Sequence, residues 1–160
     1  MKYGTFTYGI PPETYDQIRD YLIAKLSGIT PAVGKVQDYY RYLTRRKAIQ
    51  AELFLDGVLN VWFVQKAGQQ DSYPGPGTLE RTHLINLVGF MAINDAAASE
   101  KTFLRNITGI VGCLQADYTW GGLATLTKPP KVGKIGQQGF INTICHSGVI
   151  SLSPLERISL

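Results

Sequence analysis

The sequence predicts an α+β fold in a single domain: a mixed, mainly antiparallel sheet with helices packed on one face. The first observation behind this prediction is size, because 160 residues of which 44% are apolar can bury a core of their own. The second is order along the chain, where strand-like runs come as consecutive pairs on either side of one long helical segment. Consecutive strands with short connections favour antiparallel pairing.

Residues 1–12 are predicted to be an N-terminal arm, and residues 13–160 to be the domain. Tyr3, Phe6 and Tyr8 alternate loosely along the arm, which Pro11 and Pro12 then interrupt. Exposed aromatic side chains without a partner are unusual. Two interpretations stay open for these three residues: a frayed terminus, or contacts with a neighbouring subunit.

The first half of the domain reads as helix, strand, helix, strand. A helix is predicted over residues 13–27, because apolar side chains recur at near-helical spacing and Gly28 follows. Residues 35–42 read as a short strand, residues 44–54 as a second helix, and residues 58–65 as a strand rich in β-branched and aromatic side chains. Residues 66–77 lack periodicity and end in glycines and prolines, so a long loop is predicted there.

The second half begins with a strand over residues 79–91, amphipathic at its start and apolar on both faces at its end. Asn94 and Asp95 are predicted to open a helix that runs to about Ala116. Residues 123–127 then form a short strand. Residues 138–153 read as one long strand with an apolar face on its even positions, ended by Pro154.

Few residues suit catalysis or metal binding, so no catalytic site, no metal and no cofactor is expected. Cys145 and His146 are neighbours on a predicted strand and point to opposite faces, so they cannot act as nucleophile and base for each other. Two cysteines and two histidines match no zinc spacing. The uncharged, mostly apolar run over residues 84–93 is too short to span a bilayer, and residues 1–12 do not read as a signal peptide. We therefore expect a soluble intracellular product without a membrane partner.

The charge balance is mildly basic, with a net charge of +4. The densest basic run is Arg45, Arg46 and Lys47. A solvated helix face explains such a run, and a contact with an anion or a nucleic acid is the alternative.

Several segments in series resemble tail terminator proteins of long-tailed (siphophage-like) bacteriophages. Residues 92–103 (AINDAAASEKTF) resemble the start of the long helix of that family, and residues 144–153 (ICHSGVISLS) resemble its final strand, which bears a Cys-His pair. Residues 123–131 (LATLTKPPK) resemble the short strand and proline break between them. The segments 38–47, 60–66 and 81–83 follow in the expected order, so the resemblance covers roughly residues 13–153.

The resemblance implies a non-enzymatic structural protein. Six copies would form a ring on the last ring of the tail tube, stop tube polymerisation and offer a surface to the head connector or neck protein, with DNA passing through the lumen without sequence-specific binding. The protein would be assembled in the host cytoplasm and reside in the virion, at the tail or neck. We expect the tube contacts at Lys66, Gln69, Gln70, Asp71 and Tyr73, and the subunit contacts at Tyr3, Phe6, Tyr8, Arg45 and Arg46.

Two other functions remain open at this point. Another neck or head-completion protein would bind the portal-side connector in place of the tube. A basic nucleic-acid-binding module would lose affinity steeply as salt rises, because its binding releases counterions.

Overall fold

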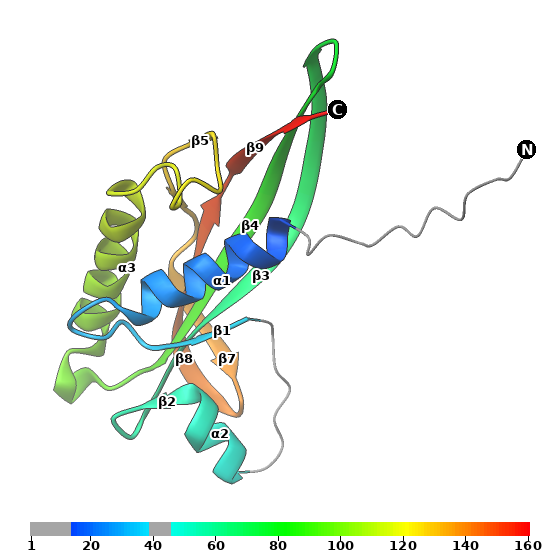
Figure 1. Ribbon diagram of the computed structural model, residues 1–160. Helices are drawn as coiled ribbons and strands as arrows, with labels where there is room; N and C mark the ends of the chain where they lie inside the picture. The colour runs from blue at the N-terminus through cyan, green and yellow to red at the C-terminus, as the bar shows by residue number, and fades with distance from the viewer. Residues whose placement is uncertain (1–13, 39–45) are drawn as a thin grey trace, which may run out of the picture.

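The computed structural model describes residues 14–38 and 46–160 (Figure 1). The predicted α+β class is confirmed, because within these residues helices pack on a mixed sheet in which β1 and β3 are parallel and every other pairing is antiparallel. The described elements in chain order are α1 (Thr14–Ser27), β1 (Lys35–Gln37), α2 (Arg46–Leu53), β2 (Phe54–Leu55), β3 (Val58–Gly75), β4 (Thr78–Ala92), the 3-10 turn η1 (Asp95–Ala97), α3 (Ser99–Gln115), β5 (Leu126–Thr127), β6 (Lys131–Val132), β7 (Gly136–Phe140), β8 (Thr143–Leu152) and β9 (Pro154–Ser159).

A long β3–β4 hairpin forms the centre of the sheet. Its pairing runs from Asn60 opposite Met91 to Gly75 opposite Thr78. At the base of the hairpin, β1 flanks β3, and β8 flanks β4 with β6 and β7 on the outer side of β8. Further along, β9 takes over from β8 as the neighbour of β4. Figure 1 shows the distal part of the hairpin projecting beyond the helices.

The sheet buries apolar side chains on both of its faces. On one face, α1 and α3 pack over Trp62, Leu87 and Ile150 in the larger core cluster. On the other face, the short helix α2 and the β7–β8 hairpin cover a smaller cluster that includes Phe63 and Phe90. The two long helices therefore share one face, as expected, while α2 contacts the opposite one.

The prediction of a loop over residues 66–77 is wrong. Strand β3 continues to Gly75, and β4 starts at Thr78. The side chains of residues 66–75 are polar or small and show no alternation, yet ladder hydrogen bonds are made by the main chain, which needs no side-chain pattern. Strand β4 lies beside residues 66–75 and supplies the partner groups for these main-chain hydrogen bonds.

The prediction of one strand over residues 138–153 is also wrong. The chain reverses at Ile141 and Asn142, whose φ angles of 49° and 55° build a two-residue hairpin turn between β7 and β8. Ile144, expected on the apolar face, is 65% exposed, and burial along β8 alternates regularly only from His146 onward. Pro154 does not end the sheet either, since it begins β9.

The remaining boundaries differ by smaller amounts. The strand predicted over residues 123–127 is limited to Leu126 and Thr127. The helix predicted from Asn94 is divided into η1 and α3 by Ala98, whose φ of 52° is left-handed. The strand predicted over residues 35–42 is observed as β1, and the helix over residues 44–54 as α2, with residues 39–45 outside the described part.

Candidate contact surface on the β3–β4 hairpin

A β-bulge decides which hairpin side chains share a face. Lys66 pairs with Ile85 and Gly68 with Leu84, so Ala67 is an extra residue on β3. One inserted residue shifts the alternation by one position. Lys66, Gln69 and Asp71 therefore lie on the face that α1 covers nearer the base.

These three predicted contact residues lie together, but their side chains contact one another and other residues of the same chain. The amine of Lys66 donates to Oε1 of Gln69 at 3.2 Å, and the amide of Gln69 donates to Asp71 at 3.3 Å. The Lys66 amine also lies 5.0 Å from the centre of the Tyr15 ring. Gln70 falls on the opposite face of the hairpin, away from this chain of polar contacts.

Charged side chains further along the hairpin are paired across strands. Arg81 donates from two nitrogens to the two carboxylate oxygens of Asp71, at 3.0 and 3.1 Å. These hydrogen bonds hold the pKa of Asp71 below its usual range. On the neighbouring strand pair, Arg157 contacts Glu80 at 2.6 Å. Each cation faces an anion directly, so this part of the hairpin has little net charge.

A buried polar cluster fixes the hairpin to the body of the protein. His83, which is 2% exposed, lies with its Nε2 3.1 Å from Oε2 of Glu156 on β9. The hydroxyl of Thr14, at the start of α1, donates to the other oxygen of Glu156 at 2.6 Å. Residues from α1, β4 and β9 thus meet at one carboxylate. The sequence carries no local pattern that joins them, because they are up to 142 positions apart.

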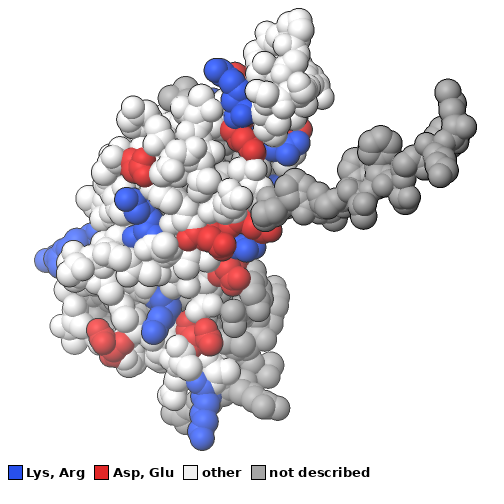
Figure 2. Space-filling model, in the orientation of Figure 1, with Lys and Arg blue, Asp and Glu red and all other residues white. Residues whose placement is uncertain are grey.

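The tip of the hairpin differs from the rest in chemistry. Residues 72–79 contain no charged side chain and include Tyr73, Pro74 and Pro76. Tyr73 is 73% exposed. Figure 2 shows the distal end of the hairpin without charged side chains, above blue and red groups at its root. Among the predicted tube contacts, Tyr73 is therefore the one that belongs to this uncharged, exposed tip.

The predicted subunit contacts cannot be placed in the same way. Tyr3, Phe6, Tyr8 and Arg45 lie outside the described residues, as does the side chain of Arg46. These five residues stay predictions.

Cys145 and His146 face opposite sides of the sheet, as their adjacency predicts. Cys145 is buried in the cluster with Phe63, and burial raises the pKa of its thiol to about 11. The ring of His146 packs against α3, with Nε2 2.8 Å from the hydroxyl of Ser99. That hydroxyl also accepts a hydrogen bond from the backbone N–H of Asn94 at 2.8 Å.

Within residues 14–38 and 46–160, no group of three or more His, Cys, Asp or Glu side chains is placed to hold a metal ion. No described helix has both the length and the apolar character needed to cross a membrane. No protein-family model matches the chain, and no curated protein is significantly similar to it.

Proposed function

We propose that this protein is a structural subunit of a phage tail: a homohexameric ring that caps the tail tube, ends its polymerisation and forms the joint with the head. The observation that carries the proposal is the β3–β4 hairpin, which extends past the core and ends in an exposed, uncharged tip. The resemblance of residues 13–153 to tail terminators supplies the biological setting.

The hairpin is long relative to the body that supports it. Beyond Phe63, the described residues of β3 pair with β4 alone and leave the other edge of the strand without a described partner. Natural proteins protect such edges, because a free edge invites pairing with another chain. An assembly in which neighbouring molecules cover the projecting hairpin accounts for this feature.

The side-chain contacts narrow the region that would meet the tube. Lys66, Gln69 and Asp71 are held by neighbours in the same chain, so they shape the hairpin and are less available to a partner. Gln70 and Tyr73 remain exposed and lie on or near the distal end. Burying the uncharged tip carries little desolvation cost for ionised groups. We therefore place the tube contact at residues 70–78.

Shortening the hairpin tests this proposal. Residues 71–81 are replaced by Asn-Gly, which keeps Gln70 opposite Thr82 and supplies a two-residue turn. Residues 157–160 are removed as well, because β9 pairs there with residues that the change deletes. The buried contacts of His83 and Glu156 are retained.

We expect the shortened protein to fold, with a cooperative urea transition, and to fail in capping. Tail tubes assembled with it and viewed by electron microscopy should be overlong or headless. A Leu104→Ala variant, changed at an exposed position on α3, serves as the control and should give tubes of normal length. Normal tails with the folded, shortened protein would contradict the assignment of the hairpin as the tube contact.

A further inference from the structure

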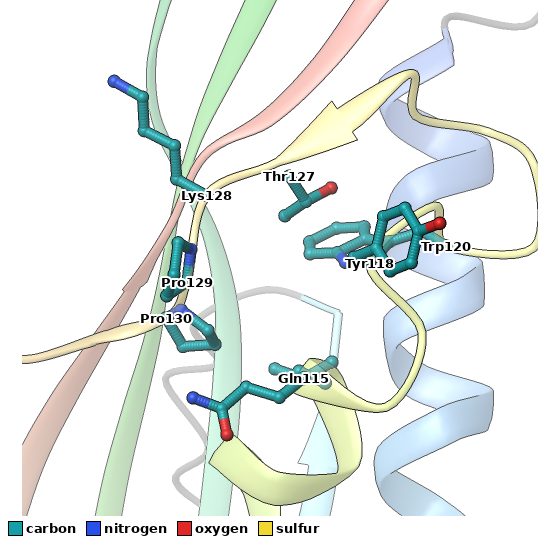
Figure 3. Close-up of a pocket in the computed structure, with 8 residues that line it drawn as sticks. Gln115, Tyr118, Trp120, Thr127, Lys128, Pro129 and Pro130 are labelled. Atoms are coloured by element: carbon teal, nitrogen blue, oxygen red, sulfur yellow. The ribbon is translucent and has the colours of Figure 1, made fainter.

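A small recess opens between the end of α3 and the segment that joins β5 to β6. Its volume is about 90 Å³, enough for one ring-sized group. In the view of Figure 3, Pro129 and Pro130 lie on one side, and Tyr118 and Trp120 on the other. Gln115, Thr127 and Lys128 are the other labelled residues of the lining.

Within the part of the chain that the structure describes, two buried polar atoms of this lining have no hydrogen-bond partner: Nε1 of Trp120 and Oγ1 of Thr127. Trp120 is 1% exposed. Trp62, the other tryptophan, uses its Nε1–H to donate to the carbonyl of Val33 at 3.3 Å. Buried donors are almost always paired in native proteins, so the recess lacks an acceptor that a bound group can supply.

The Trp120 ring is held firmly in position for such a group. Tyr21 stacks on it with the ring centres 5.8 Å apart and donates its hydroxyl to Asp117 at 2.6 Å. Asp117 also accepts from the backbone N–H of Gly121 at 2.8 Å. Trp120 itself has a φ of 50°, a left-handed conformation that costs energy and concentrates at binding sites.

These features define the chemistry of the ligand. Aromatic and proline walls favour a compact apolar ring, and the free indole N–H can donate to a carbonyl beside that ring. A proline residue in an extended peptide offers both, and aromatic recesses with a hydrogen-bond donor bind proline-containing segments in this way.

We propose that this recess binds the hairpin tip of a second copy of the chain, with Pro74 as the inserted ring. The tip is exposed and uncharged, and Tyr73 and Pro74 have no paired residue on β4, because the register passes from Ser72 opposite Glu80 to Gly75 opposite Thr78. The same chain cannot fill its own recess, because the paired hairpin carries the tip away from the body (Figure 1).

This inference deepens the proposed function and rests on it. A tip inserted into the recess of a neighbour is a head-to-tail contact, in which each copy donates one tip and receives another. Such a contact closes into a ring when its rotation closes. The hairpin therefore divides its contacts: Tyr73 and Pro74 contact the adjacent subunit in the ring, and the remaining residues of the segment 70–78 contact the tube.

Complementary variants test the contact with the full chain. A 15N-labelled Tyr73→Ala/Pro74→Ala protein keeps the recess but lacks the tip, and an unlabelled Trp120→Phe protein keeps the tip but lacks the indole N–H. The sequence has two tryptophans, so the labelled protein gives two indole N–H signals. Adding unlabelled wild-type protein should move the Trp120 signal in a saturable manner and leave the Trp62 signal in place.

Three further measurements decide the outcome. Unlabelled Tyr73→Ala/Pro74→Ala protein, the matched control, should move neither signal. Loss of the one hydrogen bond in Trp120→Phe should weaken self-association about threefold to tenfold by sedimentation. Tyr118→Ala, at a position that is 62% exposed, should weaken it as well.

An unmoved Trp120 signal at the highest soluble concentration, or equal movement with the control protein, would overturn the inference. If the protein caps tubes while this signal stays fixed, the ring is built by another contact and the proposed function stands. If the tip fills the recess but tubes remain uncapped, the contact is real and the proposed function fails.

Discussion

Replacing Gly89 by alanine should destabilise the base of the hairpin. A Cβ placed on Gly89 would lie 2.5 Å from two ring atoms of Trp62 and 2.7 Å from a third. Optimal carbon–carbon separations are about 3.5–4.0 Å, so the indole would have to move by about 1 Å. Trp62 is fully buried, stacks on Phe103 at 5.7 Å and donates to Val33, so it has little room to move.

Overpacking of a close-packed core costs about 1–3 kcal/mol. For a chain of this length, each kcal/mol lowers the melting temperature by about 2–4 °C. We therefore expect Gly89→Ala to lower the free energy of unfolding by about 1–3 kcal/mol, measured by urea denaturation with tryptophan fluorescence.

Gly136→Ala is the matched control. Gly136 is also on a strand, but a Cβ there meets nothing within 4 Å, so its stability should change by less than about 0.5 kcal/mol. If Gly89→Ala were as stable as the wild type while Gly136→Ala behaved as expected, the packing of Gly89 against Trp62 would not limit stability and the reasoning would fail.

Three further predictions concern polar groups. Glu156→Ala should lower the free energy of unfolding by about 1–3 kcal/mol, because it leaves the buried imidazole of His83 without this partner. Glu156→Gln keeps a polar partner and should lower it less, and urea denaturation of both variants compares them. The Tyr21 hydroxyl lowers the pKa of Asp117 to about 2, so its carboxylate stabilises the fold fully above about pH 4 and progressively less toward pH 2. The stability difference between wild type and Asp117→Asn should shrink steeply over that range, and a difference as large at about pH 2 as at about pH 5 would exclude this cause. Cys145 should resist iodoacetamide at pH 8 in the native protein, and mass spectrometry should find it alkylated only after unfolding, because its thiol is fully buried with a raised pKa.

The parts of the fold that the sequence predicts well are those where side-chain periodicity follows burial. Tyr15, Ile18, Leu22 and Leu26 recur at helical spacing, and all four are buried in α1. The apolar run over residues 58–65 lies in β3 at the centre of the sheet. In these segments the local pattern and the tertiary environment agree.

The errors occur where main-chain pairing or backbone conformation decides the structure. Polar residues 66–75 form a strand because β4 lies beside them, and no alternation of their own indicates it. Ile141 has a φ of 49°, which is uncommon for a β-branched residue, so the turn after β7 carries little sequence signal.

The sequence points to residues 66–73 as a contact region, and the structure places them on the projecting hairpin, where their contact with a partner stays a prediction. The bulge at Ala67 then turns Lys66, Gln69 and Asp71 into a set of internal contacts. The recess beside Trp120 is not predicted from the sequence, although its lining lies within residues 114–130, because no side-chain pattern there indicates how the segment after β5 folds back toward the end of α3.

The most direct test of the proposed assembly is the mass of the protein bound to purified tail tubes. The proposal predicts particles at tube ends with six times the 17.6 kDa mass of one chain, visible as rings by electron microscopy. The protein with the shortened hairpin should form no such particles at the tube ends. A protein that leaves tube ends bare at every concentration, or that binds along the tube as single chains, would contradict it.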